Sequence, residues 1–451
     1  MRLYLINPSN SLVGITKIKE NRWNKYRVWK PLNLLVIAGL TPLDWDITVI
    51  DENLDIPDYA AMPQPDLVGI TAFTSQAPRA YEIAGKFRKV GIPVVIGGIH
   101  ATMCRDEAVK HADVVVTGEA EGIWGQVLED FKKCALKKVY NGSRLGMDRM
   151  PVARHDLLPN GYLLGAIQTT RGCPLNCIFC SVSSFNGRSF RHRPIADVLQ
   201  EFKMIKEKYI LIVDDNLVGT RKDHIARTKE LFREMIKAKL GKRFAAQVTI
   251  NMADDEELIK LAVKAGCFGV FIGFESTSLE GLVEIQKKFN VQNGRSINES
   301  VKKLKKQGIL VVGSFIMGLD VDKHGIGNQI ANTASYYGLD ILNTMMLTPL
   351  PGTRLWEKLE YEERIISNTF PDDWKYYTLT YPVAKYKNLS HYDMLKEEKL
   401  CSRAFYSYPR IVKRFLKNLM GMHHPIITLL ANIIYRSNVL RFPGYKMAGK
   451  I

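Results

Sequence analysis

Three absences narrow the classes of protein to which this sequence can belong. It contains no run of about eighteen apolar residues, the length that a membrane-spanning helix needs. Its first residues lack the long apolar core of a signal peptide. Its seven cysteines are odd in number and unevenly placed, which does not suit a disulfide framework. We therefore expect a cytoplasmic protein in a compartment that keeps thiols reduced.

Acidic residues are missing from the last part of the chain, although the whole sequence is strongly basic. The formal net charge is +17, and ten Lys or Arg residues but no Asp or Glu follow Glu398. Such an excess of positive charge is found in proteins that bind nucleic acid, anionic lipid or an acidic substrate, and also in proteins that merely have a solvated lysine-rich face. In residues 409–419 and 425–440 basic and apolar residues are mixed. Helices of this kind either lie on a membrane surface or pack against their own protein.

The first part of the chain alternates strand-like and helix-like runs. A length of 451 residues suggests two or three domains. In the first of these, residues 1–145, we expect strands at 3–7, 46–50, 67–71, 94–97 and 114–117. This alternation predicts an α/β fold with a doubly wound, Rossmann-like parallel sheet. Ligands bind beyond the carboxyl ends of such strands, where the candidate residues are Thr71, Ser75, Gly97, Gly98 and Glu119.

The same alternation resumes after a polar linker near residues 148–156. Expected strands lie at 165–170, 210–214, 245–250, 269–273, 309–314 and 341–347. Residues 146–360 should therefore form a partial (βα)6 barrel of the TIM type, with its active site at the carboxyl ends of the strands. Residues 361–451 carry no assignable motif, and we expect a mostly helical, basic extension.

The most specific motif is a group of three cysteines directly after a strand-like run. Cys173, Cys177 and Cys180 have the spacing C-x3-C-x2-C. Three thiolates from one loop can hold three irons of a [4Fe–4S] cluster and leave the fourth iron open to a small molecule. The alternatives are a zinc site or unpaired thiols. Zinc needs four ligands, usually as two separated pairs, and the other cysteines here are scattered singly.

This spacing, with Phe179 before the last cysteine, resembles the radical S-adenosylmethionine (radical SAM) superfamily. The resemblance implies a cluster that cleaves SAM to a 5′-deoxyadenosyl radical, with Phe179 beside the adenine. It also implies further SAM contacts at the strand ends. Asp215 would bond the ammonium group or position the substrate, with a helix N-cap as its alternative role. Glu275 would bind the ribose, and Ser314 and Gly318 would lie near the adenine and the SAM carboxylate.

The first domain resembles the cobalamin-binding domain of B12-dependent radical SAM enzymes. The resemblance rests on the run from Gly97 to Thr102, on Gly118-Glu119, and on the position of the domain before the cysteine motif. It implies that the strand-end candidates named above border the corrin or its tail. The Asp-x-His-x-x-Gly motif of cobalamin mutases is absent, which leaves the lower cobalt ligand open. His100 is one candidate, although a histidine in a glycine turn is more often a structural hydrogen-bonding group. A vestigial domain that binds nothing is a further alternative.

The resemblance predicts an enzyme that methylates an unactivated carbon of a small molecule, and a lipophilic substrate is one option. Its cofactors would be a [4Fe–4S] cluster, SAM and cobalamin. The deoxyadenosyl radical would remove a hydrogen, and methylcobalamin would supply the methyl group. A reductase or a flavodoxin or ferredoxin would donate electrons, and the basic tail is a candidate for peripheral contact with the inner membrane surface. No individual catalytic residue can be assigned from the sequence.

Two alternatives remain open at this point. One is a non-methylating radical reaction on the same scaffold, such as the oxidative ring closure of the anaerobic magnesium-protoporphyrin ester cyclase type. The other is a basic nucleic-acid-binding protein with a structural cluster. We do not expect a nucleic-acid partner, because no RNA-binding motif is visible and the basic residues lack clustered aromatic platforms.

Overall fold

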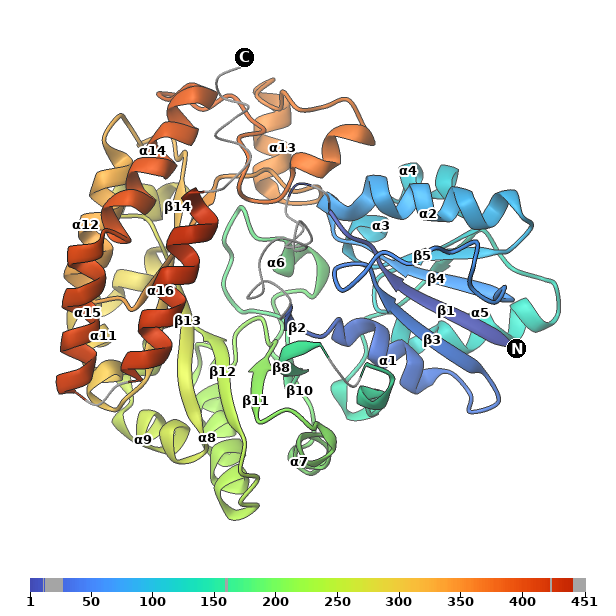
Figure 1. Cartoon of the computed structure of the whole chain (residues 1–451), viewed down its shortest axis with the longest axis horizontal. Coiled ribbons are helices and arrows are strands. Elements are labelled where there is room, and N and C mark those ends of the chain that lie inside the picture. The colour runs from blue at the N-terminus through green and yellow to red at the C-terminus, as the bar shows by residue number, and fades with distance from the viewer. Residues whose placement is uncertain (11, 13–26, 159–160, 422–423, 441–451) are drawn as a thin grey trace.

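The computed structural model describes residues 1–10, 12, 27–158, 161–421 and 424–440. It contains two parallel sheets side by side, with a helical C-terminal part beside the second sheet (Figure 1). Three of the ten basic residues that follow Glu398, namely Arg441, Lys446 and Lys450, lie outside the described residues. No helix in the described part of the chain is long and apolar enough to span a membrane.

The first sheet has six parallel strands in the order β3-β1-β4-β5-β6-β7. Its strands are β1 (Arg2–Asn7), β3 (Asp46–Asp51), β4 (Leu67–Thr71), β5 (Val94–Gly97), β6 (Val114–Thr117) and β7 (Val139–Asn141). Successive side chains of a strand point to opposite faces, and in β1 both faces are buried. Tyr4 and Ile6 join one apolar cluster, whereas Leu3 and Leu5 join another. This burial on both faces is typical of a doubly wound sheet, as expected.

Helices cover both faces of this first sheet. The cluster around Tyr4 and Ile6 contains α2 (Ala77–Lys89), α3 (Ile99–Met103) and α4 (Arg105–His111). The cluster on the opposite face contains α1 (Leu32–Leu40) and α5 (Trp124–Lys132). The strand order reverses direction at β1 and β4, so the carboxyl ends of these strands form the edge at which such folds bind ligands.

The second sheet is the partial barrel, and all six predicted strands are present in it. They are β8 (Tyr162–Ile167), β11 (Tyr209–Ile212), β12 (Arg243–Val248), β13 (Cys267–Glu275), β14 (Leu310–Met317) and β15 (Ile341–Met346). The outer face is covered by α7 (Ile195–Met204), α8 (Lys222–Lys237), α9 (Glu256–Lys264), α11 (Ile297–Lys306) and α12 (Ile326–Tyr337). The expected α/β class is therefore confirmed.

A seventh strand of the barrel sheet was not expected from the sequence. Strand β2 (Arg27–Trp29) lies between β1 and α1 in the chain, yet it pairs in parallel with β8. Arg27 aligns with Tyr162 and Trp29 with Leu164. The chain therefore contributes one strand to the barrel sheet before it forms most of the first domain. The predicted domain boundary between residues 145 and 146 assigns this strand to the first domain instead.

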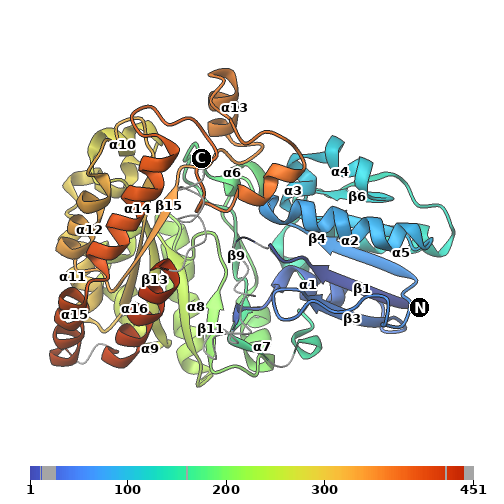
Figure 2. The same cartoon turned by 45° about the horizontal axis from the view of Figure 1, so that its top comes forward.

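The C-terminal part packs against both sheets. After α13 (Arg354–Tyr361), a 3-10 helix at Asp372–Tyr376 crosses to the first domain, where Trp374 Nε1 donates hydrogen bonds of 3.0 Å to both carboxylate oxygens of Glu107. The chain then returns to the barrel as α14 (His391–Phe405), α15 (Tyr408–Met420) and α16 (Pro425–Leu440). This crossing is visible in Figure 2, where the orange segment lies over both halves.

The end of α14 covers the open edge of the barrel sheet. β15 is the last strand in the sheet, so its outer N–H and C=O groups have no neighbouring strand. The Tyr406 hydroxyl accepts a hydrogen bond from Leu342 N at 3.0 Å and donates one to Leu342 O at 2.6 Å. A single buried side chain thus satisfies both outward-facing backbone groups of Leu342, an edge residue that is itself buried.

Candidate active site

The three cysteines lie in a loop at the carboxyl end of β8, between the two sheets (Figures 1 and 2). The loop runs from β9 (Thr170–Arg171) to α6 (Ser181–Phe185). Gly172 begins it with φ +91°, and a Cβ there would lie 2.1 Å from Ser189 O, so this position requires glycine. Ile178 connects the loop to two neighbours: its N–H donates to Ile285 O at 3.3 Å, and its C=O accepts from Leu355 N at 3.0 Å.

The three thiols are close enough to influence one another. Burial raises the pKa of the Cys177 thiol to about 11 and that of the Cys180 thiol to about 12, and it also raises the pKa of Cys173. Among the described residues, no three His, Cys, Asp or Glu side chains converge on one point as the ligands of a single metal ion do. Cluster thiolates need not converge in this way, because each one binds a different iron.

Two aspartates after β11 brace this loop. Asp214 is buried and accepts hydrogen bonds from Thr169 N at 2.6 Å, Thr169 Oγ at 2.6 Å and Thr170 Oγ at 2.9 Å. Asp215 accepts from Gly172 N at 2.7 Å and Asn186 Nδ2 at 2.9 Å. Burial raises the pKa of both carboxyls, that of Asp214 to about 6. Asp215 caps no helix, so it acts in this structure as a clamp on the cysteine loop.

A further residue beside the cysteines escaped the sequence analysis. Asn216 is buried, and its Nδ2 lies 3.9 Å from Cys173 Sγ. Its Oδ1 accepts from Gly219 N at 3.3 Å and from Thr249 Oγ at 3.2 Å, which fixes the amide orientation. The one feature of the sequence that could have indicated a role for Asn216 is its position in the run Asp-Asp-Asn directly after a strand.

Glu275 ends β13 in a buried ion pair. Its Oε1 lies 2.6 Å from Lys287 Nζ, and its backbone has φ +67° after a register shift between Gly273 and Glu275. A Cβ at Gly273 would come within 2.1 Å of Glu275 Oε1 and 2.8 Å of Lys287 Nζ, so glycine makes room for the pair. Burial alone would lower the pKa of Lys287, but the Glu275 carboxylate holds this pKa above its ordinary value.

Several buried polar atoms on neighbouring strands of the barrel, or just after them, lack a protein partner in the described part of the chain. Within the described residues, Glu275 Oε2, Ser314 Oγ and Asn251 Oδ1 have no hydrogen-bond partner. Ser314 aligns with Gly273 across the β13–β14 pairing, which places it one strand away from Glu275 on the sheet. Buried polar groups are nearly always paired in native proteins, so unpaired atoms gathered at strand ends indicate the place of a polar ligand.

Two other predicted SAM contacts have different surroundings. Phe179 is partly buried and packs against the barrel core. Gly318 has φ +100° in a turn where its N–H donates to Asp322 Oδ2 at 2.8 Å, and a Cβ would lie 2.7 Å from the Tyr386 ring. The structure therefore brings the cysteines, Glu275 and Ser314 to one region and gives Gly318 a tight turn against α14.

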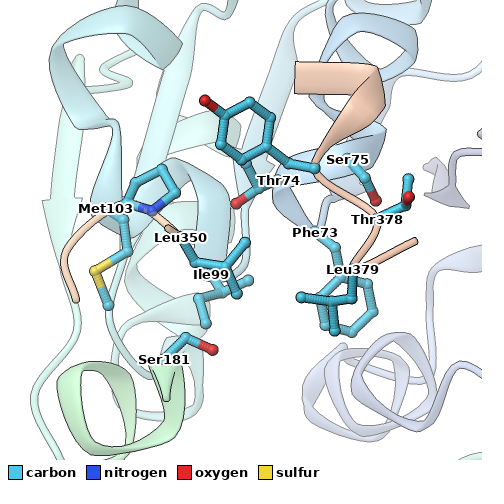
Figure 3. Close-up of a pocket in the computed structure, with 11 residues that line it drawn as sticks. Phe73, Thr74, Ser75, Ile99, Met103, Ser181, Leu350, Thr378 and Leu379 are labelled. Carbon is cyan, nitrogen blue, oxygen red and sulfur yellow. The ribbon is translucent and has the colours of Figure 1, made fainter. Parts of the chain in front are cut away.

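A cavity of about 190 Å³ lies between the first domain and the cysteine loop (Figure 3). Ser181, the residue after Cys180, is in its wall. Most of the lining is apolar, and it comes from the carboxyl ends of β4 and β5, the turn before α13 and the crossing segment. The lining residues are Phe73, Thr74, Ser75, Ile99, Met103, Ser181, Leu350, Pro351, Tyr377, Thr378 and Leu379.

The predicted corrin-border residues lie in three different settings. Ser75 lines the cavity. Thr71 Oγ accepts from Asn33 Nδ2 at 2.8 Å, and a Cβ at Gly98 would lie 2.8 Å from that oxygen, so Gly98, with φ +94°, fits closely beside it. At Gly97, by contrast, a Cβ would meet only ordinary contacts.

Glu119 joins the first domain to the barrel domain through two arginines. Both carboxylate oxygens bond Arg191, and Oε2 also lies 3.3 Å from Arg171 Nη1, next to the cysteine loop. Leu145 N donates to the same oxygen at 3.1 Å. Burial tends to raise the pKa of Glu119, but these arginines hold that pKa below its ordinary value.

His100 occupies a structural position in a buried network. It is completely buried, and its Nε2 lies 3.0 Å from Tyr81 Oη and 3.2 Å from Glu107 Oε1. Its ring also packs against the edge of Trp374 at 5.4 Å. This arrangement supports the interpretation of His100 as a structural hydrogen-bonding group.

Comparison with known proteins agrees with this geometry. A model of the radical SAM superfamily matches residues 167–325, and a model of the B12 binding domain matches residues 25–128. Bacteriochlorophyllide d C-12(1)-methyltransferase of Chlorobaculum tepidum is 31% identical over 85% of this chain and 84% of its own length. Hopanoid C-2 methylase of Rhodopseudomonas palustris is 27% identical over 74% of this chain and 65% of its own.

The fold is also found in a solved structure. The radical SAM methyltransferase TsrM from Kitasatospora setae, with cobalamin and a [4Fe–4S] cluster bound, superposes with a TM-score of 0.62 at 18% identity. The match covers 80% of this chain and 78% of that one.

Proposed function

The chain belongs to the cobalamin-dependent radical SAM methyltransferases, and from this premise we propose that it methylates an unactivated carbon of a lipophilic, fused-ring small molecule. Its cofactors are a [4Fe–4S] cluster, SAM and cobalamin. When bound, these groups supply the radical that removes a hydrogen atom from the substrate and the methyl group that replaces it. The single observation that carries the substrate class is the apolar cavity between the cysteine loop and the first domain.

In this proposal Cys173, Cys177 and Cys180 hold the cluster. The residues fit that role, because one rigid loop supplies three neighbouring thiols and Asp215 fixes the start of the loop through Gly172 N. Metal binding replaces the thiol protons, so thiols whose pKa is raised by burial still serve as ligands. Asn216 would stay beside Cys173 and limit its movement.

Glu275 and Ser314 would bind SAM. The buried, unpaired Oε2 of Glu275 can accept from ribose hydroxyls, and Ser314 Oγ can bond the adenine or the carboxylate. Lys287 would act as a positioning residue, because its 2.6 Å ion pair leaves only one Glu275 oxygen for the ligand. Phe179 and Gly318 would add to the adenine and carboxylate surroundings, and Asp215 to those of the ammonium group.

The corrin would lie at the carboxyl edge of the first sheet. Thr71, Ser75, Gly97 and Gly98 belong to this edge, and Glu119 would hold the two domains in register around it. Because the Nε2 atom of His100 is engaged with Tyr81 and Glu107 inside the first domain, we propose that His100 does not ligate the cobalt.

The substrate class follows from the cavity walls. Leu350, from the turn before α13, and Leu379, from the crossing segment, present apolar surface to the cavity, which favours a substrate with little charge. Phe73 and Ile99 belong to the first-domain wall of the cavity, which would border the corrin. The two methyltransferases compared above act, by their names, on bacteriochlorophyllide d and on hopanoids. Both of these are large, lipophilic ring systems, which supports the same class here.

Two partners complete the proposal. The cluster receives its electron from a reductase or from a flavodoxin or ferredoxin. The basic tail contacts a membrane surface, where lipophilic substrates dissolve. Family membership favours this enzyme over the nucleic-acid-binding alternative.

The test is anaerobic reconstitution with iron, sulfide, SAM, hydroxocobalamin and reductant, followed by incubation with a lipid extract of the source cells. We expect 5′-deoxyadenosine, S-adenosylhomocysteine and a lipid heavier by one methylene unit. Cys177→Ala should abolish all three products. Cys134→Ala, which changes an exposed cysteine outside the loop, is the matched control. SAM cleavage with an oxidised, unmethylated product would instead indicate the cyclase type of reaction. RNA binding without SAM cleavage would contradict the proposal altogether.

A further inference from the structure

Helix α16 buries its polar residues and exposes its apolar ones. Thr428 and Asn432 are each 1% exposed, whereas Ile426 is 67% and Ile433 47% exposed. An α-helix repeats every 3.6 residues, so positions 426, 430 and 433 form one stripe, with 427 and 434 beside it. A helix that covers a soluble core has the opposite polarity.

The buried polar face attaches α16 to the barrel by hydrogen bonds. Asn432 Nδ2 donates to Asp340 O at 2.9 Å, and its Oδ1 accepts from Arg414 Nη2 at 2.6 Å. Asn418 of α15 donates to Asp340 Oδ1 at 2.8 Å and to Thr428 Oγ at 3.2 Å. Packing against the rest of the chain therefore accounts for the polar face of α16 but not for its apolar one.

Helix α15 extends the apolar surface and adds charge to it. α15 packs beside α16 (Figures 1 and 2). Its exposed apolar residues alternate with the exposed Lys413 and Lys417. We call the combined surface the α15–α16 face. It consists of Val412, Leu416, Leu419, Met420, Ile426, Ile427, Leu430, Ile433 and Ile434, all of which are exposed.

We propose that the α15–α16 face lies in the interface of an anionic lipid membrane, with Lys413 and Lys417 at the headgroups. The inference rests on the membrane contact proposed above for the tail and names the surface that makes it. An apolar stripe flanked by lysines is the pattern of an interfacial helix. The absence of any Asp or Glu after Glu398 removes the charges that an anionic surface would repel.

Charge also decides between a membrane and a second copy of this chain. A two-fold contact places the same patch of both copies face to face. Two faces that both carry Lys413 and Lys417 would then be pressed together, with no acidic residue on either helix to pair with these lysines. An anionic lipid surface instead supplies opposite charge and an apolar layer together.

The test is sedimentation of the full chain with vesicles, which needs no cofactor chemistry. We expect binding to phosphatidylcholine vesicles that contain phosphatidylglycerol, weak binding to pure phosphatidylcholine, and release at high salt. Ile426→Asp with Ile433→Asp should abolish binding. Leu43→Asp, which changes a residue of the first domain that is 92% exposed, should not. Lys413→Gln and Lys417→Gln should each lower the partition coefficient about fivefold, equivalent to about 1 kcal/mol per charge.

A further variant tests the proposal even if the aspartate variants fail to fold. Ile433→Trp keeps the face apolar, and its fluorescence should shift to the blue when phosphatidylglycerol vesicles are added. Three results would overturn the proposal: no binding of the full chain at low salt, a dimer that Ile433→Asp dissociates without any vesicle binding, or binding that appears only when the chain is shortened to Leu440. None of these results concerns SAM cleavage or methyl transfer, so the proposed catalytic function is tested independently of membrane binding.

Discussion

Replacing Lys287 by methionine should destabilise the fold, because it would leave a buried carboxylate without its counter-charge. The Lys287 side chain is 10% exposed and that of Glu275 is 6% exposed, and Nζ and Oε1 are 2.6 Å apart. Removal of one partner from a buried ion pair typically costs about 3 to 5 kcal/mol. Methionine has nearly the shape of the lysine stem, so the loss of packing should contribute little.

A double-mutant cycle separates the charge effect from the packing effect. Lys287→Met leaves Glu275 unpaired, and Glu275→Gln leaves Lys287 unpaired. The double variant contains neither buried charge, so it should cost less free energy than the sum of the single variants. For residues in direct contact we expect a coupling free energy of about 1 to 3 kcal/mol.

The assay is urea unfolding of anaerobically prepared, cluster-free protein, followed by circular dichroism. Working without the cluster keeps metal binding out of the comparison, because a ligand that binds only the native state would add its own stabilisation. Lys287→Arg keeps the charge and is the conservative control. A loss below about 1 kcal/mol for Lys287→Met, or strictly additive single variants, would refute the ion-pair argument.

Three further predictions concern groups away from this pair. Tyr406→Phe leaves Leu342 N and O buried without partners, so the free energy of unfolding should fall by about 2 to 4 kcal/mol in a denaturant titration; no change would contradict the edge-capping role. Burial raises the pKa of Glu398 to about 7 from 4.5, so the native state holds a proton that the unfolded state releases, and stability should fall as pH rises through this window. In thermal unfolding measured between pH 4 and pH 8, Glu398→Gln should remove about 3 kcal/mol of this pH-dependent change in the free energy of unfolding. An unchanged dependence of stability on pH would disprove the raised pKa of Glu398. His100→Gln should leave the absorption spectrum of bound cobalamin unchanged, whereas a shift in the cobalt bands would make His100 a ligand.

Local sequence patterns predicted most of the architecture. The five expected strands of the first sheet and the six of the barrel are all present, because most of them are rich in the β-branched and aromatic residues that favour strands. Strand β2 could not be predicted, since it is three residues long and its partner β8 lies more than a hundred positions away. Its place in the barrel sheet also means that a deletion of residues 1–140 would remove a barrel strand, so point variants are better tests of cobalamin binding.

Long-range pairing was the part of the site that the sequence could not predict. Glu119 follows a glycine at a strand end, which suggested a ligand contact, and nothing nearby indicated its ion pairs with Arg171 and Arg191. No sequence pattern singled out Lys287, and only the fold shows its carboxylate partner, Glu275. The tail was predicted by composition to have a basic amphipathic character, but the inward direction of Asn418 and Asn432 depends on Asp340, which no local pattern links to them.

The most direct test of the central claim is transfer of an isotopically labelled methyl group from SAM. The protein should be reconstituted anaerobically with the cluster and cobalamin, and lipids from the reaction should be analysed by mass spectrometry. We predict that the label appears on a carbon of one lipophilic product, that 5′-deoxyadenosine accumulates with it, and that Cys177→Ala abolishes both. Label transfer that persists in Cys177→Ala, or SAM cleavage that never delivers the label to a product, would contradict the account.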